Sequence, residues 1–369
     1  MTKRRELRGI QLAVGKGNMR QLNPSNFLVR SQSNSKAWHK VEWERNRWIC
    51  DCPDFAKQPK KCKHIYAVGY YLKLKEISAG VRDNDDEGKC PICGRTNPVI
   101  KRGVRHNRSG MVQRYYCKRC EVKFSGRTAF KGMKTKAAAV VVALDLYYRG
   151  LSLRQISEHL EASHGIRVAH GTVYYWLKKY VELVNRYVKN LRAETSERWH
   201  ADETLLQVQG RHLVLWALLD SETRFLIATR VSRGRGEEDA HALIKKGLKK
   251  CEVEPMELVT DGLSSYSAAL RKISKTRRKK RPLIHLQGPL IEALNNKMER
   301  FCGTVKARTK PMCGFNSGKS AKKFMKGFEV YYNFIKPHRS LGGKTPAQAA
   351  GLSKKKYTWL DLISDSEKT

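Results

Sequence analysis

Trp199-His-Ala-Asp202-Glu-Thr-Leu-Leu-Gln-Val-Gln209, followed at once by Gly210, is the stretch that decides the fold. It predicts a strand, and Gly210 predicts the turn that ends it. Leu213–Leu219 and Phe225–Val231 predict a second and a third strand. We therefore expect three consecutive antiparallel strands, with an acid, Asp202, in the middle of the first.

The next segments predict helices alternating with a strand. Glu238–Lys249 predicts a helix, and Met256-Glu-Leu-Val-Thr-Asp261-Gly262 predicts a buried strand that ends in an acid. Ser264–Ile273 predicts the helix after it. Open α/β sheets place their sites at the carboxyl ends of strands, so Asp261 is a candidate site residue.

A further helix is predicted from Pro289, since proline favours the first helical position. One apolar stripe comprises Leu290, Leu294, Met298, Phe301 and Val305. The opposite face comprises Glu292, Asn295, Glu299, Gly303 and Lys306. These residues alone indicate only the solvated face of an amphipathic helix, and Glu292 is equally explained as a first-turn acid at the helix dipole.

The first cysteine cluster is Cys50-Asp-Cys52, nine residues, then Cys62-Lys-His64. Three thiolates and one imidazole make a tetrahedral zinc set. Phe27–Arg30 and Trp38–Trp43 predict short strands before it, and Ile65–Leu74 predicts a helix with His64 at its start. The pattern resembles the SWIM-type zinc finger, a family whose module binds DNA or protein partners. The alternative is four unrelated residues.

The second cluster is Cys90-Pro-Ile-Cys93 and Cys117-Lys-Arg-Cys120, with 23 residues between the pairs. Two such knuckles close one zinc site and predict a zinc ribbon, whereas a redox site needs only one pair. The intervening loop carries Lys101, Arg102, Arg105 and Arg108, which we interpret as phosphate contacts, the alternative being a solvated loop. Cys251, Cys302 and Cys313 have no assigned role.

Residues 135–188 predict a helix-turn-helix region. Thr135–Tyr148 predicts a first helix capped at Thr135, and Ser152–Leu160 a second with a Ser152/Gln155 capping box. A basic third helix starts near Gly171-Thr172. The alternative is a helical linker that packs on the core.

The charge of the whole chain indicates a polyanionic partner. Seventy-four Lys and Arg against 34 Asp and Glu leave a net charge of +40, which favours nucleic acid. Ribosomal or histone-like packing and membrane-surface binding are the alternatives. We find no signal peptide, and the longest apolar run, Ala137–Leu144, is too short for a membrane span. We therefore expect a cytoplasmic, nucleoid-associated prokaryotic protein.

The motifs at Asp202, Asp261 and Glu299 resemble those of insertion-sequence DDE transposases, which have an integrase-like, RNase H-like core. The matching segments are Trp199-His-Ala-Asp202-Glu203-Thr204, Thr260-Asp261-Gly262, Asn295-Asn-Lys-Met-Glu299-Arg300 and a closing segment, Tyr331-Tyr-Asn-Phe-Ile-Lys-Pro-His338-Arg339 through Pro346. The resemblance covers about residues 135–352. The 37 residues between Asp261 and Glu299 slightly exceed the usual gap, and the basic insert Lys275–Arg281 accounts for the excess. Glu292 therefore stays open beside Glu299, which Asn295 and Arg300 favour.

The resemblance implies DNA cleavage and strand transfer with two Mg²⁺ ions, or Mn²⁺ in their place. Two ions roughly 4 Å apart activate the attacking oxygen and stabilise the leaving oxygen, and hard cations prefer carboxylate ligands. Asp202 would bridge both ions, and Asp261 and Glu299 would each complete one. Water would free a 3′-hydroxyl, which would then attack the target without a covalent protein–DNA intermediate. Two structural Zn²⁺ ions complete the predicted cofactors.

The predicted partner is double-stranded DNA, both the ends of the mobile element and the target DNA. We expect a homodimer or higher oligomer to bind it, and we expect no membrane partner. The candidate DNA-binding residues are Thr172, Tyr174, Tyr175, Lys178, Lys179, Arg277, Arg278, Lys279, Lys280, Arg300 and Lys306. An inactive, domesticated DNA-binding regulator and a Holliday-junction resolvase are the competing functions.

The predicted fold class is a multidomain α/β protein with a mixed-sheet catalytic core. We expect a SWIM domain over 1–80, a zinc ribbon over 81–130, a helix-turn-helix region over 131–195, an RNase H-like catalytic domain over 196–352, and a tail over 353–369.

Overall fold

The computed structural model describes residues 2–367 except 16, 35, 81–87, 89, 91, 94, 108–109, 126–129, 131–132, 134, 277–282 and 288–294. The predictions for Arg108, Arg277–Lys280 and Glu292, and the helix start at Pro289, lie outside the described residues. The chain divides into two compact units, residues 1–177 and 178–369. In the described part, every helix is too short or too polar to cross a bilayer.

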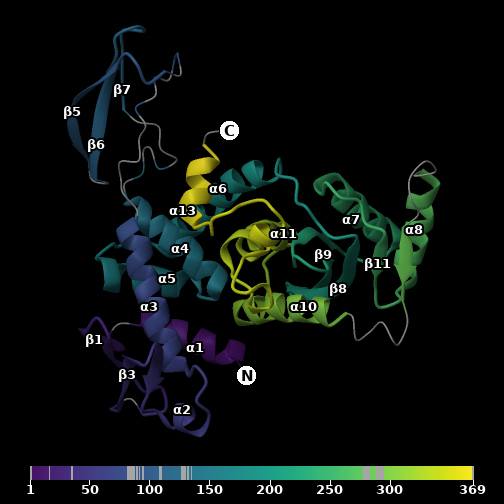
Figure 1. Cartoon of the computed structure of the whole chain (residues 1–369), viewed down its shortest axis with the longest axis horizontal. Coiled ribbons are helices and arrows are strands. Elements are labelled where there is room, and N and C mark those ends of the chain that lie inside the picture. The colour runs from purple at the N-terminus through teal and green to yellow at the C-terminus, as the bar shows by residue number, and fades with distance from the viewer. Residues whose placement is uncertain are drawn as a thin grey trace. The chain divides into compact units, whose positions relative to one another are not determined.

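The first unit begins with a small helical and β-sheet module (Figure 1). Four antiparallel strands lie in the order β1-β2-β3-β4, and helix α1 packs against α3. The elements are α1 (Thr2–Val14), β1 (Met19–Asn23), β2 (Asn26–Arg30), β3 (Trp38–Glu44), β4 (Arg47–Cys50), α2 (Pro53–Lys57) and α3 (Lys63–Gly80). Phe27, Val29 and Val41 are fully buried, so the alternation of the predicted strands creates the core of this module.

A three-stranded sheet and three helices complete the first unit. The sheet comprises β5 (Val99–Asn107), β6 (Gly110–Cys117) and β7 (Val122–Ser125), and the helices are α4 (Ala137–Arg149), α5 (Leu153–His164) and α6 (His170–Val188), which continues into the second unit. Ser152 and Gln155 form the predicted capping box. The predicted cap at Thr135 is wrong, because α4 begins at Ala137 and Thr135 does not directly precede it.

The second unit contains a five-stranded mixed sheet in the order β10-β9-β8-β11-β12. Strands β8, β9 and β10 pair antiparallel, β11 pairs parallel to β8, and β12 pairs parallel to β11. The strands are β8 (Arg198–Val208), β9 (Arg211–Asp220), β10 (Leu226–Ser232), β11 (Glu257–Val259) and β12 (Ile284–Leu286). This topology confirms the predicted α/β, RNase H-like fold class.

Helices cover both faces of this sheet (Figure 1). The helices that follow α6 are α7 (Glu237–Lys250), α8 (Ser264–Thr276), α10 (Asn296–Thr309), α11 (Gly318–Val330), α12 (Pro346–Ala349) and α13 (Trp359–Asp365), with short turns η2 (Lys310–Met312), η3 (Tyr331–Ile335) and η4 (Arg339–Leu341). Of these, α7, α10 and α11 pack on the sheet. Gly247 brings α7 so close to the sheet that an added Cβ would lie 2.4 Å from Leu218 Cδ2. On the opposite face, Cys302 of α10 lies near Asp202, and Glu329 of α11 accepts a hydrogen bond from Thr229.

The helix that carries Glu299 differs in one respect from the prediction. Met298, Phe301 and Val305 are buried, as the apolar stripe predicts. Asn295, predicted on the exposed face, is 8% exposed. Asn295 keeps right-handed helical backbone angles, so the difference is that this polar side chain is itself buried at the start of α10.

Candidate active site and metal centres

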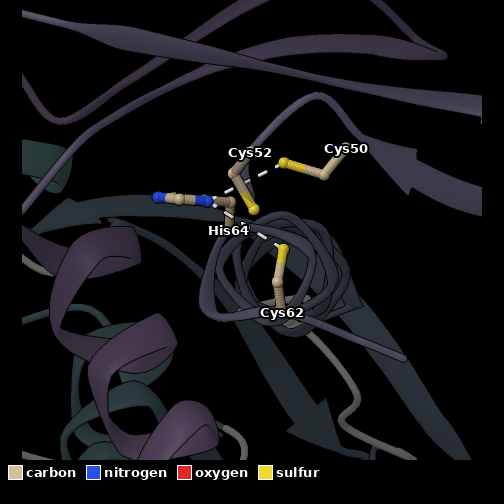
Figure 2. A group of neighbouring side chains, drawn as sticks. All are labelled: Cys50, Cys52, Cys62 and His64. Carbon is tan, nitrogen blue, oxygen red and sulfur yellow. Dashed lines mark hydrogen bonds between the residues drawn. The ribbon is translucent and has the colours of Figure 1, made fainter. Parts of the chain in front are cut away.

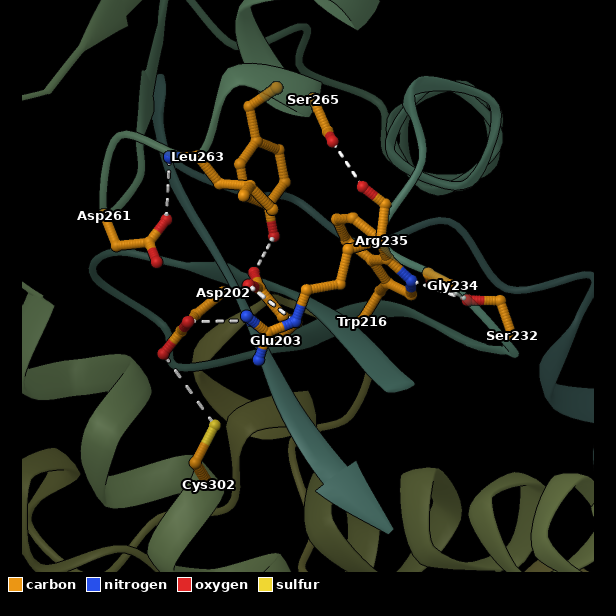
Figure 3. Close-up of polar contacts among 11 residues, drawn as sticks. Asp202, Glu203, Trp216, Ser232, Gly234, Arg235, Asp261, Leu263, Ser265 and Cys302 are labelled. Atoms are coloured by element: carbon orange, nitrogen blue, oxygen red, sulfur yellow. Dashed lines mark hydrogen bonds and ion pairs between the residues drawn. The ribbon is translucent and has the colours of Figure 1, made fainter. Parts of the chain in front are cut away.

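A cluster of carboxylates forms where β8 passes the end of β11. The two strands pair over residues 198–200 and 257–259, so Asp202 lies beyond the paired stretch and Asp261 lies two residues after β11. Asp202, Glu203 and Asp261 each offer a carboxylate oxygen within 4.8 Å of the others. Figure 3 shows Asp202 and Asp261 with their polar contacts. Three oxygen donors this close together suit a hard divalent cation.

Asp202 is strongly perturbed by this environment. Burial raises its pKa to about 7, and the negative charges of Glu203, Asp261 and Glu299 add to the effect. The backbone N–H of Glu203 donates to Asp202 Oδ1 at 2.7 Å and opposes the rise. The cluster therefore carries negative charge that no neighbouring cation compensates fully, which is the electrostatic setting a bound metal ion relieves.

Glu203 belongs to this cluster although the sequence analysis gave it no role. Adjacent residues of a strand point to opposite faces, and Glu203 faces α8, where Tyr266 Oη donates to its Oε2 at 3.2 Å. Arg235 Nε lies 3.7 Å from Glu203 Oε1. Burial is the main cause that raises the pKa of Glu203, followed by the charge of Asp261. The adjacent acid in the Asp202-Glu203 pair was the available signal.

Glu299 lies in the first turn of α10 and is exposed. It is not part of the group of oxygens within 4.8 Å, yet its charge reaches Asp202 and contributes to the raised pKa there. The same helix brings Cys302 Sγ within 4.0 Å of Asp202 Oδ2 (Figure 3). Burial, followed by the negative charge of Asp202, raises the pKa of Cys302 to about 12, so this cysteine is a neutral neighbour of the carboxylates.

Cys50, Cys52, Cys62 and His64 converge in the first unit (Figure 2). Their ligand atoms lie within 4.8 Å of one another, and all four residues are buried. His64 Nδ1 lies 3.7 Å from Cys50 Sγ and 3.9 Å from Cys62 Sγ. Cys50 ends β4, and Cys62 directly precedes α3, so His64 lies at a helix start as predicted. The donor set fits tetrahedral zinc.

Cys90, Cys93, Cys117 and Cys120 form a second group within 4.8 Å. Cys93 Sγ and Cys117 Sγ are 3.9 Å apart. Cys117 is the last residue of β6, and the turn that follows carries Cys120 toward β7. Four thiols in two knuckles on a three-stranded sheet are the geometry expected of a zinc ribbon.

The predicted recognition helix, α6, exposes two large aromatic side chains. Tyr174 is 47% and Tyr175 56% exposed, whereas Trp176 is buried. Lys178 is exposed, and Lys179 Nζ lies 5.1 Å from the centroid of the Tyr180 ring. Thr172 is half-buried, while Arg300 and Lys306 are exposed on α10.

Comparison with known proteins identifies both the core and the first cysteine cluster. A family model described as the DDE domain matches residues 196–338, and one described as the SWIM zinc finger matches residues 46–73. The transposase for insertion sequence element IS257 in transposon Tn4003 of Staphylococcus aureus is 30% identical over 201 residues, which are 54% of this chain and 85% of that protein.

The chain belongs to the DDE transposases of insertion sequences. An uncharacterized protein of Methanocaldococcus jannaschii is also 30% identical to this transposase, over 224 residues that cover 58% of the chain and 94% of that protein. Among solved structures, the catalytic core domain of HTLV-2 integrase in complex with magnesium is 12% identical. The match covers 43% of this chain and 98% of the integrase domain, with a TM-score of 0.31.

Membership confirms the predicted family and places the transposase among the polynucleotidyl transferases, which act on DNA. The DDE domain implies a divalent metal ion, and the SWIM finger implies zinc. The matched DDE segment contains Asp202, Asp261 and Glu299, and the matched SWIM segment contains the whole first cysteine cluster.

Proposed function

We propose that this transposase is an active enzyme that cleaves the ends of its element and joins them to target DNA with Asp202, Asp261 and Glu299 as metal ligands. The observation that carries the proposal is the buried, uncompensated charge at Asp202, whose pKa stands at about 7. A strongly perturbed carboxylate is typical of functional sites, and Asp261 beside it follows the carboxyl end of β11, where open α/β sheets place their sites. Two Mg²⁺ ions, or Mn²⁺, would supply Lewis-acid activation of both oxygens in the displacement.

The chain's own residues would contribute position and charge. Asp202 lies between Asp261 and α10, and the negative charges of both Asp261 and Glu299 act on its carboxylate. Its carboxylate would therefore be suited to binding metal ions shared with both acids. Tyr266 and Arg235 hold Glu203 to one side, so its position is fixed by the protein. We propose that Glu203 orients the cluster and that Glu299 is the third ligand.

A strand-transfer assay with isosteric amide variants tests this assignment. Glu299→Gln removes a ligand charge and is expected to lower the rate by about a thousandfold or more, since a lost metal interaction costs several kcal/mol. Glu203→Gln keeps the hydrogen bond from Tyr266 and is expected to stay within about tenfold of the unmodified enzyme.

The matched control is Glu252→Gln, which changes an exposed acid in the same unit. Its rate is expected to be unchanged. Full activity of Glu299→Gln would overturn its assignment, and if Glu203→Gln then lost activity, Glu203 would take the place of Glu299. A chain that binds element ends but never joins them would be an inactive regulator, and the proposed enzyme would be refuted.

DNA recognition would use the modules before the core. We propose that each cysteine cluster holds one Zn²⁺ and that Thr172, Tyr174, Tyr175, Lys178 and Lys179 of α6 contact duplex DNA. Exposed aromatic and basic side chains on one helix support this role. Arg300 and Lys306 would contact the backbone beside the acidic cluster. We further propose that the transposase acts as a homodimer or higher oligomer on its ends.

A further inference from the structure

A cavity of about 570 Å³ opens in the second unit along β10, the edge strand of the sheet that lies farthest from β11. It is framed by the last turn of α6, β10, α7, α11 and η3. Its floor is apolar and includes Phe225, Val231 and Met325. A cavity of this size is typical of ligand sites. It lies two strands away from β8 in the strand order, so it is separate from the carboxylate cluster.

The rim of the cavity is strongly basic. Its seven cationic side chains are Lys189, Arg230, Lys246, Lys249, Lys250, Lys322 and Lys326. Three acids pair with some of them: Asp239 with Arg230 at 2.6 Å, Glu182 with Lys326 at 3.3 Å, and Glu329 with Lys246 and Lys250 at 3.8 and 4.0 Å. Seven cations against three acids leave a local excess of 7 − 3 = +4.

Three of the lysines have no ion-pair partner among the described residues. Lys189, Lys249 and Lys322 are exposed at the rim. Lys189 directly follows α6, Lys249 lies in α7 and Lys322 lies in α11. All three nevertheless border the same cavity. Like charges gathered by the fold repel one another, and an anion between them would remove that repulsion.

Asn185 supplies an independent observation. It lines the cavity and is only 5% exposed, and within the described part of the chain its Nδ2 has no hydrogen-bond partner. A buried amide donor without an acceptor costs about 1–3 kcal/mol, and such groups are rare in folded proteins. The missing partner must be a hydrogen-bond acceptor, which excludes another cation and an apolar ligand as the group that Asn185 contacts.

Lys250 adds to the same conclusion. Its Nζ lies 5.3 Å from the centroid of the Phe225 ring, and its nearest acid is the shared Glu329. Burial lowers its pKa, and the neighbouring charge of Lys246 lowers it further. An anion in the cavity would offset both effects.

We propose that this cavity is a phosphate-binding site, with Asn185 as the buried donor and Lys249 and Lys322 as the charged rim. A phosphate group offers both the acceptor oxygens that Asn185 needs and the negative charge that the rim needs. The DNA backbone and free phosphate are the two sources of this group. With DNA as the source, the site would anchor the duplex at a second place, away from the metal-binding carboxylates. With DNA as the source, the inference rests on the proposed function, in which DNA is the substrate.

Binding measurements on the full chain without Mg²⁺ test the site while no DNA is cut, so failure here is distinguishable from failure of the proposed catalysis. The perturbations are Lys249→Ala with Lys322→Ala, and separately Asn185→Leu, which removes the donor at similar volume. The probes are inorganic phosphate, a short DNA duplex and a polyglutamate peptide. The double lysine variant is expected to reduce the slope of log K against log salt for the duplex by about 1 to 2.

The matched control is Lys245→Ala with Lys323→Ala, two exposed lysines on the same helices, α7 and α11, outside the cavity lining. This variant is expected to keep the salt slope of the unmodified protein. If inorganic phosphate alone loses binding in the cavity variants, the site is confirmed with free phosphate as its source. Equal duplex slopes for both lysine pairs together with unchanged phosphate binding would overturn the proposal. Unchanged binding of both phosphate and duplex in Asn185→Leu, or loss of peptide binding alone, would also overturn it.

Discussion

Replacing Asp202 by asparagine is expected to stabilise the transposase when no divalent metal is bound. Asp202 is buried among Glu203 and Asp261 and within reach of the charge of Glu299, and these effects raise its pKa from the ordinary 3.8 to about 7. Asparagine has nearly the same shape, keeps an oxygen to accept the hydrogen bond from the backbone N–H of Glu203, and carries no charge.

The pKa gives the size and the pH window of the effect. An acid whose folded pKa lies at about 7 binds protons more tightly in the folded state, so folding is penalised when the group ionises. The penalty is absent below about pH 4 and grows between about pH 4 and 7, where the unfolded chain ionises while the folded carboxyl keeps its proton. Above pH 7 it stays at roughly 4 kcal/mol. At pH 5 less than half of this penalty should remain. For a unit of this size, 2–4 kcal/mol raises the unfolding temperature by roughly 4–16 °C.

Calorimetry of the full chain measures this effect, in buffer that retains zinc and contains neither chelator nor Mg²⁺. We expect Asp202→Asn to raise the unfolding temperature of the catalytic unit at pH 8, and Mg²⁺ to stabilise only the unmodified protein. Glu252→Gln, an exposed acid of the same unit, should change neither value. A lower unfolding temperature for Asp202→Asn at pH 8 would refute the reasoning that burial, together with the neighbouring negative charges, makes the ionised Asp202 destabilising.

Three further outcomes follow from buried polar groups. Cys52→Ser should lower the zinc content, measured by atomic emission, by one ion per chain, whereas the exposed Cys313→Ser should leave it unchanged. Equal zinc contents in the two variants would contradict the assignment of the first zinc site. His159 has a pKa lowered to about 4, chiefly by burial, so its contribution of about 3 kcal/mol should be lost as pH falls from 6.5 through 4; a flat pH profile of unfolding temperature would contradict this. Asp145→Asn removes the buried negative charge that pairs with Arg149 and should destabilise the first unit by about 3–5 kcal/mol in denaturant titrations, against less than 1 for the exposed Glu161→Gln.

The sequence predicted the elements that depend on local pattern. All three antiparallel strands of the core and the capping box at Ser152 are present. Both cysteine groups converge because their short spacings leave little freedom to the chain. The error at Thr135 is a boundary error, since a cap must directly precede the first helical residue and α4 begins at Ala137.

The place of Glu203 next to Asp202 was the one signal for it in the sequence, and this signal was missed for a geometric reason. Alternation places it on the opposite face from Asp202, and a pattern along one strand therefore separates the two acids. Asp202 and Glu203 both approach Asp261 because β8 extends past the three-residue strand β11, and Asp261 follows the end of β11. Strand length relative to a neighbour is a tertiary property. The cavity that we propose to bind phosphate was missed for a related reason, since its lining comes from five elements.

With the proposed functions, the acidic cluster and the basic cavity would together let a chain with a net charge of +40 position DNA for cleavage. Positive charge spread over the surface attracts a duplex anywhere, whereas the acidic cluster repels phosphates until cations neutralise it. DNA bound at basic sites such as the proposed cavity would therefore stay away from Asp202 until metal is present. Metal binding would convert this repulsive region of the core into an attractive one, so loading of the carboxylates and engagement of the scissile phosphate should be coupled events. On this argument the strain at Asp202 is a cost of folding that the catalytic metal ions offset.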